Sequence, residues 1–150
     1  MSETRNAGAM DPQVSSEQVL EFRLGGETYC VEIGFVAEIV DADELTPVPN
    51  APPEVEGMMD LRGRTTSIVD PKVVFGIEDE GEGKRIVVFD EQAVGLGGAT
   101  GWIVDEVVQV VDVSDGDVEP SPVAEDDAVH GIVRREDGLV IWVRPDAVHD

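Results

Sequence analysis

The 150-residue sequence has few of the residues on which catalytic and metal sites usually depend. Cys30 is the only cysteine, so an internal disulfide is excluded and a thiolate metal cage is not expected. His130 and His149 are the only histidines, and no Gly-x-Ser-x-Gly motif of a nucleophilic serine is present. We therefore expect no catalytic residues, no metal site and no cofactor.

Long apolar runs are also missing. A helix that crosses a bilayer needs about 20 consecutive apolar residues, and no segment of this chain approaches that length. The first residues are small and polar and lack the apolar core of a secretory signal. We predict a disordered N-terminal tail over residues 1–16, no direct insertion into a membrane, and a cytoplasmic location.

Basic residues are scarce: 10 face 33 acidic residues, which gives a net charge of −23 and a pI of about 4.1. Such a surface repels phosphate backbones, so nucleic-acid binding is not expected. Its self-repulsion opposes folding in dilute buffer, but at about 1 M salt the Debye length falls to about 3 Å and the repulsion is largely screened. We therefore predict a halophilic protein from a salt-rich cytoplasm, with an ordinary acidic protein as the alternative.

Short apolar segments with strand-like alternation run through most of the chain, separated by turn residues. Gly25-Gly26 and Asp137-Gly138 predict two hairpin turns. Residues 71–76 and 145–150 predict single helical turns, and residues 92–100 a loose connection. The expected strands cover residues 19–24, 29–33, 35–40, 55–61, 65–69, 85–89, 101–105, 107–113, 129–134 and 139–143. Without a long amphipathic helix, this pattern indicates an all-β barrel or sandwich.

The segments 55–61 and 65–69 are joined through Arg62-Gly63-Arg64. A glycine between two arginines supplies a turn position without a Cβ, so the chain can reverse while both cations point outward. The planar guanidinium of Arg62 is then placed to bind a carboxylate outside the core. Arg62 is the best functional candidate that the residues alone provide, against the simpler role of a surface ion pair.

The stretch from Gly57 to Asp70, with Asp60-Leu-Arg-Gly63 at its centre, resembles the Asn-Leu-Arg-Gly signature of the chemotaxis coupling protein family CheW. The resemblance covers residues 17–148. It implies a CheW-like domain over residues 17–149, built of two packed five-stranded SH3-like barrel subdomains with short helical turns, whose boundary the sequence does not place. Asp60 and Pro71 depart from the family pattern. An acid at Asp60 could weaken or re-aim Arg62.

The same resemblance implies a non-catalytic adaptor that couples transmembrane chemoreceptors to the histidine kinase CheA. One barrel would pair with the regulatory domain of CheA, and a groove would hold the cytoplasmic tip of a methyl-accepting receptor. No residue of the kinase interface is assigned. Small and aliphatic residues with one acid and one arginine suit a helix lying in a groove. Carried over by position, the receptor-binding residues are Val36, Glu38, Gly57, Arg62, Ile86, Gly101 and Val107.

Two alternatives remain open at this point. The first is an acidic β-barrel binding module that serves another kinase pathway. The second is an enzyme that uses Asp70 and Asp105, since each follows an apolar Ile-Val pair and the two could converge as a carboxylate dyad. An acid at the end of a strand is more commonly a turn or cap former.

Overall fold

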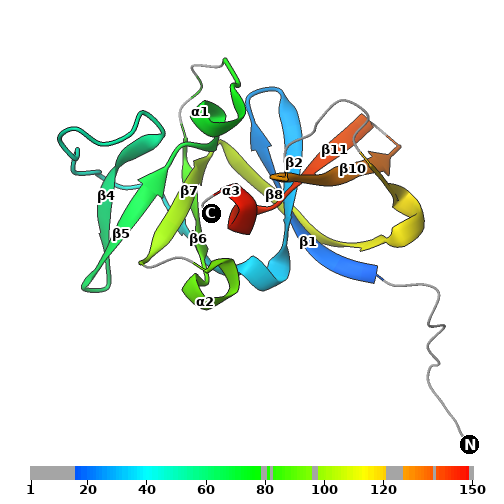
Figure 1. Cartoon of the computed structure of the whole chain (residues 1–150), viewed down its shortest axis with the longest axis horizontal. Helices are drawn as coiled ribbons and strands as arrows, with labels where there is room; N and C mark the ends of the chain where they lie inside the picture. Colours follow the sequence, from blue (N-terminus) through cyan, green and yellow to red (C-terminus); the bar gives the residue numbers. More distant parts are fainter. Residues whose placement is uncertain are drawn as a thin grey trace, which may run out of the picture.

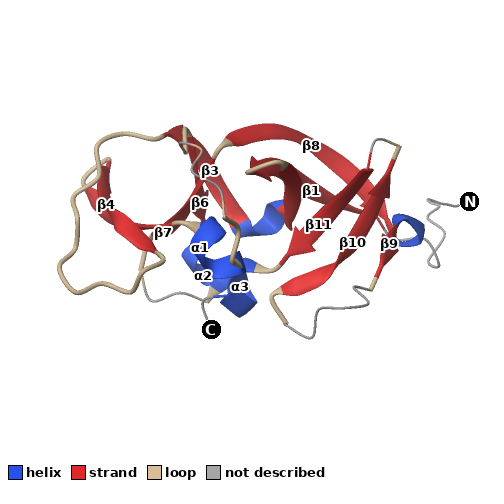
Figure 2. Cartoon of the chain, turned by 90° about the horizontal axis from the view of Figure 1, so that it is seen from above, coloured by secondary structure: helices blue, strands red, loops and turns tan. Residues whose placement is uncertain are grey.

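The computed structural model describes residues 16–78, 81, 83–95, 98–120, 127–136 and 138–148. The tail predicted for residues 1–16 lies outside this part of the chain apart from Ser16, as do Asp137 of the predicted turn and His149. The described residues form two sheets and a few short helical turns (Figure 2), so the all-β prediction is confirmed.

The first sheet has the order β8-β1-β2-β11-β10-β9. Neighbouring strands are antiparallel except β2 and β11, which run parallel. Its strands are β1 (Ser16–Leu24), β2 (Glu27–Glu32), β8 (Glu106–Ser114), β9 (Val118–Glu119), β10 (Val129–Arg135) and β11 (Gly138–Val143). The two-residue β9 adds a sixth strand to the five expected.

The second sheet has the order β3-β6-β7-β5-β4, with a parallel pair between β5 and β7. Its strands are β3 (Val36–Asp41), β4 (Val55–Leu61), β5 (Arg64–Val69), β6 (Arg85–Phe89) and β7 (Thr100–Val104). Both sheets curl strongly, and the two curled sheets lie side by side (Figures 1 and 2). The prediction of two packed barrels is confirmed.

The second barrel is an insertion within the first. The chain builds β1 and β2, passes through the 3₁₀ turn η1 (Ile33–Phe35), completes all of β3–β7, and returns to the first barrel at Asp105. A second 3₁₀ turn, η2 (Asp115–Asp117), leads from β8 into β9. The chain therefore passes between the two barrels twice, and the subdomains cannot be separated at a single position in the sequence.

Three short helices cap the strands: α1 (Pro71–Phe75), α2 (Glu91–Val94) and α3 (Pro145–Val148). The predicted turns at 71–76 and 145–150 are confirmed by α1 and α3. The loose connection expected at 92–100 was wrong in its first part, where α2 forms. Asp90 explains the difference, because its side chain accepts hydrogen bonds from the Gln92 and Ala93 amides and so caps the helix.

A shared core joins the two barrels. Trp102 on β7 is fully buried, and its ring meets those of Phe22, Phe75 and Phe89 edge-on at centroid distances of 6.3, 5.8 and 5.0 Å. Phe22 comes from the first barrel and Phe89 from the second. This packing fixes the barrels against each other.

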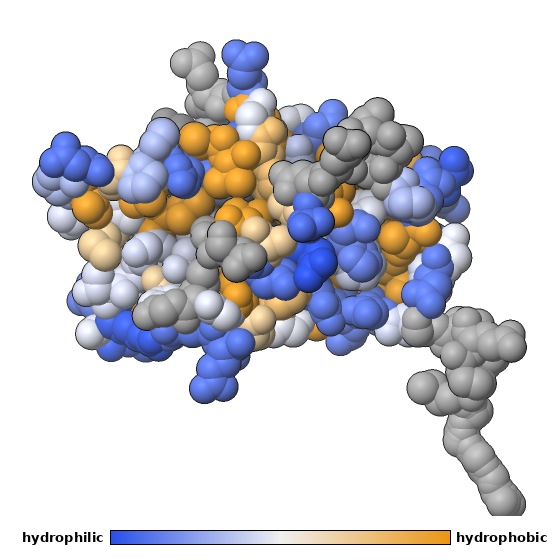
Figure 3. All heavy atoms as spheres, viewed as in Figure 1, coloured by the Kyte–Doolittle hydropathy of each residue, from blue (hydrophilic) through white to orange (hydrophobic). Residues whose placement is uncertain are grey.

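The face shown in Figure 3 is mixed, with hydrophilic residues mostly around its edge and hydrophobic residues toward its middle. An apolar area lies over the region of α1, where Val73 and Val74 are exposed. Scattered exposed valines of this kind are normal on a soluble domain and need no functional explanation by themselves.

Candidate functional site

Arg62 lies in a two-residue turn between β4 and β5. Leu61 pairs with Arg64, so Arg62 and Gly63 alone make the turn. Both have positive φ angles, 51° and 83°, and this left-handed pair matches the twist of a hairpin. Glycine adopts it freely, whereas an arginine there is strained. The turn therefore uses both residues, not Gly63 alone, and it holds Arg62 beyond the end of the strand ladder.

The Arg62 guanidinium donates a hydrogen bond from Nη2 to Oε2 of Glu38 on β3. The two side chains are 69% and 32% exposed. β3 and β4 are the outermost strands of the second sheet, and Arg62 directly follows β4. The ion pair thus links the two end strands of the second sheet. We expected Arg62 to seek an outside carboxylate; it already holds one from its own chain, on the surface.

The hydrogen bond from Arg62 lowers the pKa of Glu38 below its ordinary value, and the Arg62 charge acts in the same direction. The pKa of Arg62 is raised by the same contact. Exposed ion pairs of this kind add little to stability. The pair keeps both groups charged at neutral pH and holds them in a fixed arrangement at the surface.

A cavity of about 470 Å³ lies beside this ion pair. Its apolar lining includes Leu61, Val88 and Phe89, of which the last two are buried. A second ion pair, Arg64 with Glu91, lies on the lining of the same cavity. The remaining lining residues are Ala37, Glu38, Arg62, Thr66, Asp90, Gln92 and Ala99. The cavity is therefore a cleft of mixed lining, part apolar and part polar, with two ion pairs on its wall.

Of the seven residues carried over from the family, the structure brings Glu38 and Arg62 together on this cleft. Val36 lies two residues before Glu38 on β3, half-buried and paired with Phe89. Val107 lies on β8 of the first barrel and lines a different cavity of about 480 Å³.

The other three lie inside the second barrel. Ile86 has no exposed surface, and Gly57 and Gly101 are buried. A Cβ at Gly101 would lie 2.7 Å from Cγ2 of Ile86, and one at Gly57 would lie 2.7 Å from the Thr46 carbonyl oxygen. These residues set how closely the strands pack, and they present no side chain to a partner.

Sequence reasoning missed the Arg64–Glu91 side of the cleft, because it does not predict α2, the helix that begins at Glu91. The signal was present: an aspartate before Glu91-Gln92-Ala93 is an ordinary helix start. Asp60, which departs from the family signature, lies opposite Thr65 on the hairpin and is exposed.

Asp70 and Asp105 have structural partners. Asp70 caps α1, with its Oδ1 2.9 Å from the Lys72 amide. Asp105 accepts from Lys72 Nζ at 2.9 Å and from the Gly25 amide at 2.7 Å. Lys72 is buried. The two acids therefore hold α1 and the β1–β2 turn at the crossing between the barrels, which is the commoner role that sequence reasoning gave them.

Within the described residues, no group of three or more His, Cys, Asp and Glu side chains is arranged to hold a metal ion. No helix in that part of the chain is long and apolar enough to span a membrane. A cleft that combines apolar side chains with ion pairs is a surface on which an amphipathic helix can dock.

Residues 18–150 match the CheW-like domain, and the chain belongs to the CheW family. It is 32% identical over 135 residues to the chemotaxis protein CheW of Rhizobium meliloti, covering 87% of this chain and 86% of that one. It is 30% identical over 135 residues to the CheW of Treponema pallidum, with 83% and 76% covered. The resemblance drawn from the Arg62 segment is confirmed.

A solved structure supports the same relationship. The scaffolding protein CheW of Thermoanaerobacter tengcongensis superimposes with a TM-score of 0.75 at 30% identity, covering 86% of this chain and 89% of that one. Protein PilI of Pseudomonas aeruginosa is also similar, at 27% identity over 140 residues, with 89% and 76% covered.

Proposed function

We propose that this protein is a non-catalytic, cytoplasmic adaptor that couples transmembrane chemoreceptors to the histidine kinase CheA in a chemotaxis array. Membership of the CheW family and the similarity to a scaffolding protein support this role. The single structural observation that supports this role is the Glu38–Arg62 pair on the wall of a cleft that also has apolar side chains in its lining.

The cleft suits the helical tip of a receptor. Apolar side chains of an amphipathic helix would cover Leu61 and the buried residues beneath it, and polar groups on the helix would meet the two ion pairs. Arg62 has five N–H donors, and its hydrogen bond to Glu38 uses one of them. A receptor carboxylate would take further donors, so the existing pair orients Arg62 for docking and sets the register of the helix.

The buried residues among those carried over from the family would affect receptor binding only indirectly. Ile86 packs against Gly101 and lies on β6, the strand that also supplies Val88 and Phe89 to the cleft. A larger side chain at Ile86 or Gly101 would therefore move the cleft wall without touching the receptor. Signal would pass as a change in the geometry of the receptor–adaptor–kinase complex, with no bond made or broken.

The test is a pull-down with a receptor cytoplasmic fragment and the CheA regulatory domain, at molar KCl because like-charged acidic partners repel in dilute buffer. The unmodified protein should recover both partners. Arg62→Ala should weaken receptor binding about ten- to a hundred-fold and leave kinase binding unchanged. Arg134→Ala is the matched control, since Arg134 forms an exposed ion pair with Glu119 on the first barrel, away from the cleft. Recovery of neither partner would overturn the proposal.

A second candidate is an adaptor of the same kind in another kinase pathway, since the similar protein PilI is not named as a chemotaxis protein. The identity of the receptor and kinase captured from extract of the source cells separates the two. A kinase other than the chemotaxis CheA in the captured complex would favour the second.

A further inference from the structure

β8 is a free edge of the first sheet. Within the described residues it pairs only with β1, and it follows the outer rim of the first barrel in Figure 2. It is nine residues long, and Val108 and Val110 are 43% and 47% exposed. A long, apolar edge strand offers a row of unpaired backbone donors and acceptors to another strand.

The sequence of β8 reads nearly the same in both directions. Gln109 stands at its centre, with two valines on either side and an acid beyond each valine pair, Glu106 and Asp112. Suppose that two copies of β8 pair antiparallel about a two-fold axis at Gln109. Val108 of each copy then faces Val110 of the other, and Val107 of each faces Val111 of the other, so every pair occurs on both sides of the axis. Valine–valine pairs between neighbouring strands are among the favourable ones.

We propose that β8 pairs with β8 of a second copy of this chain, antiparallel and centred on Gln109, so that the first sheets of two molecules become continuous. A second copy is the occupant because the strand is complementary to itself: its five central residues carry no charge in a chain of net charge −23. This proposal is independent of the receptor and kinase assignments above.

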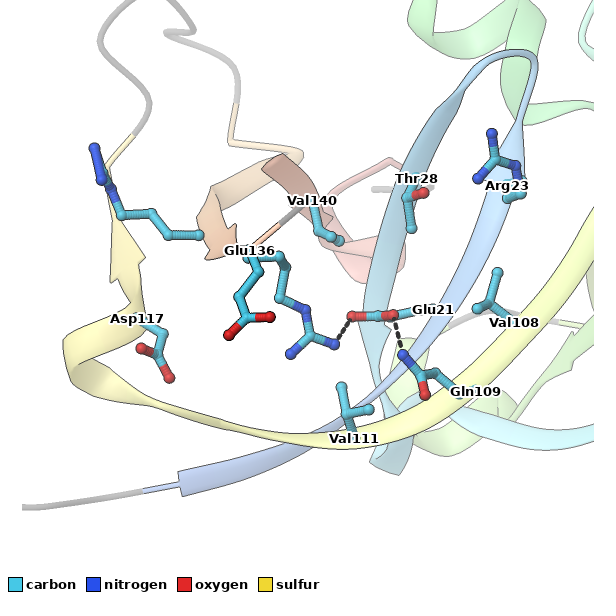
Figure 4. Close-up of a pocket in the computed structure, with 11 residues that line it drawn as sticks. Glu21, Arg23, Thr28, Val108, Gln109, Val111, Asp117, Glu136 and Val140 are labelled. Atoms are coloured by element: carbon cyan, nitrogen blue, oxygen red, sulfur yellow. Dashed lines mark hydrogen bonds and ion pairs between the residues drawn. The ribbon is translucent and has the colours of Figure 1, made fainter. Parts of the chain in front are cut away.

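The interior side of β8 is already anchored, which keeps its edge in place. Gln109 Nε2 donates to Oε1 of Glu21 at 3.0 Å, and Glu21 is also bound by Arg135. Figure 4 shows Gln109 turned toward Glu21 at the wall of a cavity of about 700 Å³. The edge is thus ordered before a partner arrives, which lowers the entropy that pairing would cost.

β8 also carries two of the usual protections against edge pairing. One is a bulge, where Val108 is the extra residue opposite β1. The other is charge: in the proposed register Glu106 faces Asp112 at both ends, and like charges placed opposite each other are destabilising. The bulge limits the ladder and makes the dimer weak. The acids, with the net charge of −23, make the dimer salt-dependent: it forms at molar salt and dissociates as the salt concentration is lowered.

The first experiment is light scattering on the full chain at high protein concentration, in molar KCl. The mass should rise from the 16.1 kDa of one chain toward twice that value. Val110→Lys should return it to one chain, whereas Val73→Lys, at a valine 45% exposed on α1, should not. Both variants add one positive charge, so a general charge effect moves them together. A monomer at molar salt, or a Val110→Lys protein that dimerises normally, overturns the proposal.

A cysteine on the axis tests the register. Gln109→Cys places two thiols opposite each other, within disulfide reach, while Glu106→Cys places them about 20 Å apart along the strands. The native Cys30 does not compete, because burial raises the pKa of its thiol to about 12. Under oxidation at molar salt Gln109→Cys should give a covalent dimer and Glu106→Cys should not. Equal cross-linking of both, or of neither, overturns the register.

Discussion

Replacing Arg135 by methionine tests how the first barrel is held closed. The Glu21 carboxylate on β1 is 4% exposed and accepts a hydrogen bond from Gln109 on β8 (Figure 4). It accepts another from Arg135 at the end of β10. β8 lies at one end of the strand order and β10 near the other, so Glu21 ties both sides of an unclosed sheet from within. Arg135→Met leaves this buried carboxylate with one amide donor.

The size of the effect follows from burial. Removing one partner of a buried ion pair costs about 3–5 kcal/mol, because the remaining charge is uncompensated. Arg135 is 27% exposed, so water partly reaches the site and the lower end, about 3 kcal/mol, applies. Replacing both members, as in Glu21→Leu with Arg135→Met, removes the stranded charge and should restore most of the loss.

Urea unfolding at constant molar KCl measures these differences. Arg134→Met is the matched control, since Arg134 is 66% exposed and pairs with the half-exposed Glu119; its loss should stay below about 1 kcal/mol. A comparably small loss in Arg135→Met would refute the idea that Glu21 depends on this arginine. A double variant no more stable than Arg135→Met would refute the stranded charge as the cause.

Three further predictions concern other parts of the molecule. Gly101→Ala should lower the free energy of unfolding by about 1–3 kcal/mol, because the new Cβ would lie 2.7 Å from Ile86. Gly26→Ala, which has open space around it, should have a melting temperature close to that of the unmodified protein, and thermal melts of both variants measure the difference. Carboxyl NMR titration should find the pKa of Glu38 below its ordinary value in the unmodified protein and higher in Arg62→Ala. The small stabilisation that the ion pair gives the folded state is therefore complete above about pH 4.3 and is lost as the pH falls through the folded-state pKa of Glu38. The same Glu38 pKa in both proteins would contradict the ion pair. Circular dichroism should show structure lost in dilute buffer and regained in molar salt, and full structure without salt would count against the halophilic prediction.

Local patterns in the sequence predicted the elements well where neighbouring residues decide them. The bounds of β4 and α1 were anticipated because alternation defines Val55–Leu61, and Asp70 with a following proline caps the helix. The subdomain boundary was not anticipated, because the chain passes between the barrels at two points far apart in the sequence, η1 and Asp105. Neither crossing carries a linker-like composition that would mark it in the sequence.

The site was only partly predictable for the same reason. Arg62 stood out as a cation in a tight turn, and Glu38 as an acid among apolar residues, yet their contact joins positions 24 residues apart and follows from the curl of the sheet. Ile86 entered through the family resemblance, and its full burial shows only in the packed structure. Sequence patterns identify unusual residues; which of them meet is set by tertiary packing.

The central claim, that the Glu38–Arg62 cleft docks a receptor helix, is tested most directly by reversing the pair. Calorimetric titration at molar KCl would compare the receptor-tip affinity of the unmodified protein, Arg62→Glu, Glu38→Arg and the double reversal. The double variant can re-form the internal ion pair but presents the opposite charges to a partner. We predict that all three bind about tenfold or more weakly. Unmodified affinity in the double variant would show that the pair only supports the barrel, and would contradict the account.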